Sequence, residues 1–317
     1  MMKFWGRILV LGSIALSVAG CASDFRGRTG ASAEAARQQM APDQRTLVLA
    51  QAESDLRERK LDAALNGFLS VLQGYPDDPR AHAGTGETYL AMGNGELALK
   101  AYEAWPASIA NGAEAFQGRG IAHVLLGDEA AARTNLTKAV EADPSLWRAW
   151  NALGLINDRG RNWAQADQCY QKAAQINPGA AEIYNNRGYS LLQRGDHASA
   201  IPLFNQALRI DPTLEAARNN LTLASALQGR YEGALTAIPS EVLPTALNNV
   251  GYAALLRRDY ASAELYLTRA VQSSPRYFEK ANENLRWLNY LRGASPEEAR
   301  AARPAKASAP VVLAPAP

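Results

Sequence analysis

The stretch "WNALGLINDRGRNWAQADQCYQKAAQINP", residues 150–178, ends in an Asn-Pro pair, and proline lacks the backbone N–H group that a continuing helix uses for its hydrogen bonds. Pairs of aspartate or asparagine with proline recur along the chain, at Pro144, Pro178 and Pro212, a spacing of 34 residues. A fixed period of this length is the signature of a chain built from repeated structural modules. The sequence therefore predicts a repeat architecture around this stretch.

Counting each of these prolines as position 32 of a module aligns many other residues. Glycine or alanine falls at positions 8 and 20 of most modules, and aromatic or aliphatic residues fall at positions 4, 7, 11 and 24. We expect each module to be a helical hairpin, because small residues at positions 8 and 20 let two helices approach closely. The modules, first to seventh, begin at Arg45, Pro79, Ala113, Trp147, Ala181, Glu215 and Pro244.

Proline and glycine mark the ends of the two helices in each module. Proline at position 32 ends the second helix, and glycine at position 15 can take the left-handed conformation that ends the first helix. Two modules depart from the pattern. Trp105-Pro106 predicts a break in the second helix of the second module, and Pro239 predicts a truncated second helix in the sixth. The glycines at position 15 are Gly93, Gly127, Gly195 and Gly229.

These residues resemble the tetratricopeptide repeat, whose pattern is W-x2-L-G-x2-Y, then A-x3-F, then P. The resemblance implies an all-α superhelical solenoid of about seven helical hairpins over residues 43–277, with a capping helix over 278–293. It also implies that a protein or peptide partner binds in a concave groove lined by the first helices. The matching residues are Trp150, Leu153, Gly154, Ala166, Tyr170 and Pro178, with Asn157 in place of the tyrosine.

The N-terminal segment has a short positive start and an apolar run from Ile8 to Val18, too short to cross a bilayer as a helix. Val18-Ala19-Gly20-Cys21 resembles the lipobox of bacterial lipoproteins. The resemblance implies a signal peptide over 1–20 and lipidation of Cys21, and Ala22 after it favours the outer membrane, facing the periplasm. An ordinary signal peptide with a chance cysteine is the alternative. Residues 21–42 are expected to be a flexible tether, and 294–317 a disordered tail rich in alanine and proline.

Charge and composition argue against several function classes. The chain has 33 Lys and Arg against 31 Asp and Glu, and two of the basic residues precede Cys21, so the signs balance in the remainder. A nucleic-acid-binding protein would show an excess of basic residues. The three histidines have no metal-ligand spacing, and no nucleotide-binding or hydrolase motif occurs. We expect no enzyme, no cofactor, no metal and no nucleic-acid partner.

Asparagine is the polar residue that repeats. Asn-Asn pairs fall at positions 5 and 6 of the last three modules, with tyrosine or leucine at position 9. Two interpretations are open: the amides bind a partner's backbone in the groove, or they bond between neighbouring modules and stabilise the array. The predicted groove residues are Asn185, Asn186, Tyr189, Asn219, Asn220, Asn248, Asn249 and Tyr252.

The stretches "ARNNLTLASALQGRYEGA" and "LNNVGYAALLRRDYASAELYLTRAV" are similar to the TadD lipoproteins of tight-adherence (Flp) pilus systems. That similarity implies a pilotin-like scaffold that binds a secretin subunit or another pilus-assembly component. The alternative is an envelope adaptor that recruits peptidoglycan hydrolases or proteases, since fold alone does not select the partner.

Overall fold

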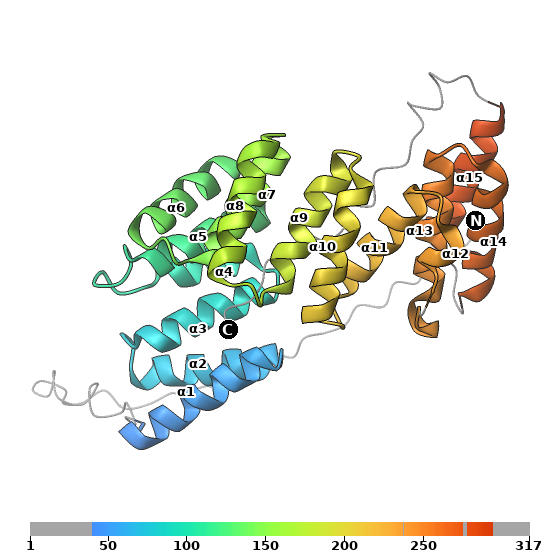
Figure 1. The fold of residues 1–317 in the computed structure, drawn as a ribbon. Helices are drawn as coiled ribbons and strands as arrows, with labels where there is room; N and C mark the ends of the chain where they lie inside the picture. Colours follow the sequence, from blue (N-terminus) through green and yellow to red (C-terminus); the bar gives the residue numbers. More distant parts are fainter. Residues whose placement is uncertain (1–39, 237, 275–277, 294–317) are drawn as a thin grey trace, which may run out of the picture. The chain divides into compact units, whose positions relative to one another are not determined.

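The computed structural model describes residues 40–236, 238–274 and 278–293, and these residues form helices and turns without a strand. Consecutive helices pack against one another from α1 to α12, and α13 to α15 continue the series from α11 (Figure 1). The first three modules contain α1 (Pro42–Arg57), α2 (Leu61–Gly74), α3 (Pro79–Ala91), α4 (Gly95–Glu103), α5 (Ala113–Leu126) and α6 (Glu129–Ala142). The next two contain α7 (Trp147–Arg159), α8 (Trp163–Ile176), α9 (Ala181–Gln193) and α10 (His197–Ile210). The last elements are α11 (Glu215–Leu227), α12 (Tyr231–Ala234), the 3-10 helix η1 (Ser240–Val242), α13 (Leu243–Leu256), α14 (Tyr260–Ser273) and α15 (Glu279–Gly293).

Each hairpin closes where a small residue of the first helix meets a large residue of the second. A Cβ atom added at Gly188, position 8 of the fifth module, would lie 2.7 Å from Phe204 Cε1 at position 24. Gly154 and Tyr170 have the same relationship, at 2.5 Å from Tyr170 Cε1. The alanines at position 20 are buried in all seven modules. The predicted packing role of positions 8, 20 and 24 is confirmed.

Position 15 has a positive φ angle in every module. The four glycines predicted to be left-handed have φ between 72° and 82°, which confirms that prediction. The other three modules place arginine there, with φ angles of 59°, 58° and 62° at Arg59, Arg161 and Arg258. The turn therefore requires the left-handed conformation regardless of the residue, and it strains the three arginines.

The second helices of the two irregular modules are shortened as predicted. Helix α4 ends at Glu103, before Trp105-Pro106, and α12 has only 4 residues. Because α12 is so short, α11 packs directly against α13, the first helix of the next module. In the sixth module the first helix thus makes the contact with the next module that a second helix makes in the other modules.

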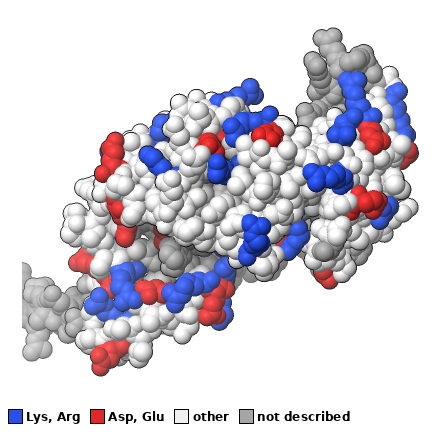
Figure 2. Space-filling model, viewed as in Figure 1, with Lys and Arg blue, Asp and Glu red and all other residues white. Residues whose placement is uncertain are grey.

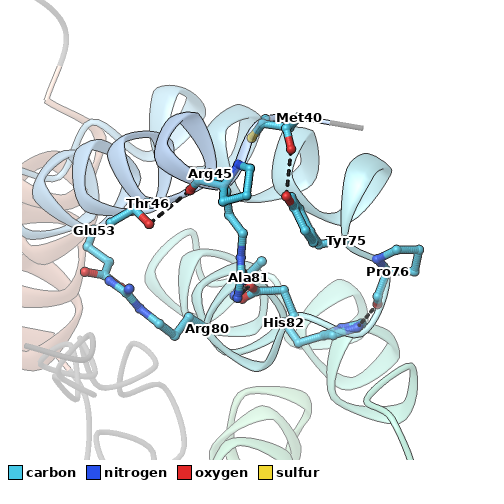
Figure 3. A network of polar contacts seen from close by, with 11 residues as sticks. Met40, Arg45, Thr46, Glu53, Tyr75, Pro76, Arg80, Ala81 and His82 are labelled. Atoms are coloured by element: carbon cyan, nitrogen blue, oxygen red, sulfur yellow. Dashed lines mark hydrogen bonds and ion pairs between the residues drawn. The ribbon is translucent and has the colours of Figure 1, made fainter. Parts of the chain in front are cut away.

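Polar contacts join the first two modules (Figure 3). Arg45 of α1 forms an ion pair with Asp78, which also accepts a hydrogen bond from the backbone N–H of Ala81 as the N-cap of α3. Arg80 Nη2 lies 2.7 Å from Glu53 Oε1 of α1. Before the second module begins, Tyr75 also donates a hydrogen bond to the carbonyl oxygen of Met40. Helix α1 is thereby bound to its neighbour by charge as well as by apolar packing.

Several predictions concern residues outside the described ranges. The predicted signal peptide 1–20, the predicted lipidation site Cys21 and the predicted tail 294–317 lie there, as does the predicted tether 21–42 up to residue 39. Within the described ranges, α1 begins at Pro42, and the helix expected to cap the array is α15.

Candidate functional site

The asparagine pairs form side-chain hydrogen bonds across module boundaries. Asn220 Nδ2 donates to Asn185 Oδ1 at 2.9 Å, and Asn186 Nδ2 donates to Asn151 Oδ1 at 3.3 Å. Asn185 Nδ2 also donates to Asn186 Oδ1, so that four amides are linked across three modules. In the two cross-module bonds, position 6 of one module donates to position 5 of the module before it. Near the end of the array, Asn284 Nδ2 donates to Asn248 Oδ1 at 2.9 Å.

Burial divides the predicted asparagines into two groups. Asn185, Asn186 and Asn220 are 1–2% exposed and Asn248 is 6% exposed, whereas Asn219 and Asn249 are half-buried. Buried amides that bond to one another stabilise the boundary between modules, because either partner alone would be left without a hydrogen bond. Such contacts are the ones expected if the asparagine row bonds between neighbouring modules and stabilises the array. The contact of the row with a partner's backbone stays a prediction.

The predicted groove residues at position 9 line one pocket. Tyr189, Leu223 and Tyr252, which occupy position 9 of the last three modules, line a single pocket of about 460 Å³ between α9, α11 and α13. The short α12 is the reason that α11 and α13 are close enough to share it. The remaining lining residues are Leu192, Gln193, Gly195, His197, Leu227, Leu256 and Arg257.

The pocket combines apolar walls with a few polar groups. Arg257 Nη1 donates to the carbonyl oxygen of Leu227 at 2.8 Å, which holds this side chain at one edge. Burial lowers the pKa of His197, so its imidazole is neutral at pH 7. The Tyr252 hydroxyl is buried and has no hydrogen-bond partner among the described residues, and its ring lies 6.1 Å from that of Trp287. Such a site suits an apolar side chain that carries a polar group.

Sequence reasoning missed the leucines of this pocket. Leu192 lies at position 12, and Leu227 and Leu256 lie at position 13 of their modules. These residues looked like ordinary core residues, because their period is that of the packed face. The truncated second helix of the sixth module could have indicated this pocket, because a missing helix leaves the neighbouring helices uncovered.

Other kinds of site were sought among the described residues. No group of three or more His, Cys, Asp or Glu there is placed to hold a metal ion. No helix in that part of the chain has the length and apolar character needed to span a membrane. On the face shown in Figure 2, acidic and basic side chains are interspersed.

The comparison with protein families identifies the repeat. The family model "Tetratricopeptide repeat" matches residues 49–113, 118–181 and 158–215, together more than half of the chain. The chain belongs to the tetratricopeptide-repeat family. Proteins built from this repeat act as scaffolds for protein–protein interaction and are generally not enzymes. The fold is therefore an all-α tetratricopeptide-repeat solenoid, as the sequence predicts.

Curated relatives of this tetratricopeptide-repeat protein are similar over part of their length. It is 30% identical over 114 residues to small glutamine-rich tetratricopeptide repeat-containing protein 2 of Mycosarcoma maydis, covering 36% of this chain and 31% of that protein. It is 31% identical over 96 residues to the peroxisomal targeting signal receptor of Candida glabrata, covering 30% of this chain and 15% of the receptor. The chain thus spans less than a third of either relative.

Solved structures share the fold. A tetratricopeptide repeat protein from Parabacteroides merdae has a TM-score of 0.50 at 16% identity, over 77% of this chain and 98% of that one. The Cut9–Hcn1 hetero-tetramer of APC/C has a TM-score of 0.55 at 17% identity, over 78% of this chain and 43% of that one. These similarities extend over most of the module array and concern the fold alone.

Proposed function

We propose that this tetratricopeptide-repeat protein is a lipid-anchored periplasmic scaffold with a pilotin-like role in the assembly of a tight-adherence (Flp) pilus. The observation that carries the proposal is the pocket shared by position 9 of three successive modules, Tyr189, Leu223 and Tyr252. The lipobox at Cys21 and the similarity of the late modules to TadD lipoproteins support the location and the pathway. The partner is a secretin subunit that the scaffold holds at the outer membrane.

The pocket and the half-buried amides contact different parts of the partner. An apolar or aromatic side chain of the secretin segment enters between Tyr189, Leu223 and Tyr252, where burial of apolar surface stabilises the complex. Asn219 and Asn249 are not fully buried, so they supply amide contacts to the backbone of the same segment. The buried asparagines hold the three modules in register beneath it.

Binding to the secretin subunit tests the pocket directly. We expect the double variant Tyr189→Ala/Leu223→Ala to bind a purified secretin subunit at least about tenfold more weakly, since two large contact residues are truncated. Leu265→Ala is the control, because Leu265 is 52% exposed and lies outside the pocket. Calorimetric titration measures the affinity, and melting temperatures show that the variants are folded. Unchanged affinity of the double variant would rule the pocket out as the secretin site.

The partner class and the membrane anchor need separate measurements. A photo-crosslinker placed at residue 223 should capture the secretin in intact cells. Capture of peptidoglycan hydrolases or proteases without secretin would establish the envelope-adaptor alternative instead. Cys21→Ser should move the protein from the membrane fraction to the soluble periplasmic fraction, because the lipid anchor is lost. If this variant stayed firmly in the membrane fraction, the anchor would lie elsewhere.

A further inference from the structure

A second cavity, of about 360 Å³, lies among α3, α4, α5 and α7, and it shares no lining residue with the Tyr189–Tyr252 pocket. Since a water molecule occupies about 30 Å³ in the liquid, this volume would hold roughly a dozen waters or one amino-acid side chain with its neighbours. The exposed residues Glu114 and Ser145 are at its rim, so the cavity is reachable from solvent.

The shortened helix α4 shapes one wall of this cavity. After α4 ends at Glu103, the chain turns so that Trp105 is buried, with its ring 5.2 Å from that of Tyr102. A regular second helix would continue through this position, as α6 and α8 do in their modules. The break at Trp105-Pro106 thus places an indole where the other modules have a helical turn.

Two buried charges of opposite sign line the cavity. Glu87 of α3 is 8% exposed and Arg148 of α7 is 5% exposed, although these helices belong to the second and fourth modules. Arg148 Nη1 lies 2.8 Å from Glu87 Oε2, and the Tyr102 hydroxyl donates to Glu87 Oε1 at 2.9 Å. Burial is the largest single effect on the pKa of Arg148 and lowers it, but the charge of Glu87 and the other contacts of Arg148 together outweigh burial, so this pKa is raised. Arg148 and Glu87 form an ion pair of opposite charges.

The polar atoms of this cluster are incompletely hydrogen-bonded. Among the described residues, none accepts a hydrogen bond from Arg148 Nε, Arg148 Nη2 or Trp105 Nε1. Glu87 Oε2 accepts none either, because its contact with Arg148 is an ion pair without hydrogen-bond alignment. Buried N–H groups without acceptors are rare in native proteins. The cluster thus offers three donors and one acceptor to a ligand.

The charge balance selects the ligand's chemistry. A carboxylate could accept from the guanidinium edge, but it would lie beside the Glu87 carboxylate, with Glu114 at the rim. A primary carboxamide has a carbonyl oxygen that accepts from Arg148 and Trp105 and an NH₂ group that donates to Glu87. It also brings no charge into a site whose charges already cancel. We propose that this cavity binds the uncharged side-chain carboxamide of a glutamine or asparagine in a partner polypeptide.

The test uses three short peptides and the full chain in detergent, isotope-labelled at tryptophan and arginine nitrogens. The probes are acetyl-Ala-Gln-Ala-amide and its Glu and Leu analogues. The Gln probe should shift the NMR signals of the Trp105 indole N–H and the Arg148 Nε–H, and it should bind about tenfold more tightly than either analogue. If the two signals do not move with the Gln probe, or the Glu or Leu probe binds as tightly, the proposal is wrong.

Two variants remove donors and keep a side chain of the same class. Trp105→Phe deletes the indole N–H and keeps a smaller aromatic ring, and Arg148→Lys keeps the positive charge beside Glu87 but deletes the Nε and Nη2 donors. Each should weaken binding of the Gln probe, by about threefold and about tenfold respectively. Trp163→Phe, which changes an indole that lines neither pocket, is the control and should bind as the wild type does. If Arg148→Lys does not fold, Trp105→Phe and the two NMR signals still decide, and unchanged binding by the folded variants overturns the site.

Discussion

Asn220 of the sixth module donates its side-chain amide to Asn185 of the fifth, at 2.9 Å and with both residues 1–2% exposed. Asn185 in turn donates to Asn186, which donates to Asn151 of the fourth module. A buried chain of neutral amides therefore crosses three modules. Each member depends on the next, because an amide left without its partner is buried unsatisfied.

Removing one amide should destabilise the array. Asn220→Ala leaves Asn185 Oδ1 without its donor, and we expect the free energy of unfolding to fall by about 1–3 kcal/mol. Asn219→Ala is the matched control, since Asn219 is the half-buried neighbour, and its loss should stay within about 0.5 kcal/mol. Urea denaturation measures both. Equal losses for the two variants would contradict the special role of the amide chain.

Gly188 should not tolerate even one added methyl group. A Cβ there would lie 2.7 Å from Phe204, so Gly188→Ala should lower the free energy of unfolding by about 1–3 kcal/mol through overpacking. The control is Gly233→Ala in α12, where the nearest atom to an added Cβ, Arg230 Cβ, is 4.0 Å away. That variant should be neutral or gain up to about 1 kcal/mol from the helix preference of alanine. A neutral Gly188→Ala would show that the hairpin relaxes around position 8.

Replacing a left-handed arginine by glycine should stabilise the protein. Arg161 has a φ angle of 58°, so Arg161→Gly removes backbone strain and should raise the free energy of unfolding by about 0.5–1 kcal/mol, net of the glycine's greater freedom when unfolded. The reciprocal change is Gly195→Ala, at a φ angle of 82° with no atom within 4 Å of an added Cβ. It should lose about 1 kcal/mol from backbone strain alone. The same sign of effect for both variants would refute this account of the turn.

Asp158 should make stability depend on pH. Burial raises its pKa above the ordinary value of 3.8, against the hydrogen bonds from Ser190 and Tyr170. A carboxyl whose pKa is higher in the folded state contributes stability below the unfolded pKa and loses it as pH rises through the folded pKa. Relative to Asp158→Asn, the wild type should therefore become less stable as pH rises from about 4 towards 7.

The control for this titration is Asp143→Asn, because hydrogen bonds from Ser145 lower the pKa of Asp143. Its contribution has the opposite sign: it is present above the unfolded pKa and is lost as pH falls. Melting temperatures of the three proteins from about pH 2 to pH 7 measure both slopes. A flat difference between the wild type and Asp158→Asn would mean that Asp158 titrates as it does in the unfolded chain.

Sequence patterns predicted the fold because the repeat is local. The 34-residue spacing of Pro144, Pro178 and Pro212 and the small residues at positions 8 and 20 all act within one hairpin or between neighbours. The break after α4 and the shortness of α12 were also predicted, from Trp105-Pro106 and Pro239. The three left-handed arginines were not predicted. Glycine at a turn indicates a positive φ angle in a sequence, whereas arginine does not.

The sequence by itself determined the module register, the helical hairpins and the positions of the asparagine and tyrosine residues along the chain. Only the tertiary structure decided what those residues contact. It turned Asn185, Asn186 and Asn220 into a buried chain, brought Tyr189 to the same pocket as Tyr252, and paired Glu87 with Arg148 across two module boundaries. The physical reason is that a period specifies which face of a helix a residue occupies, whereas burial and partners depend on how neighbouring modules pack. That packing changes wherever a second helix is cut short.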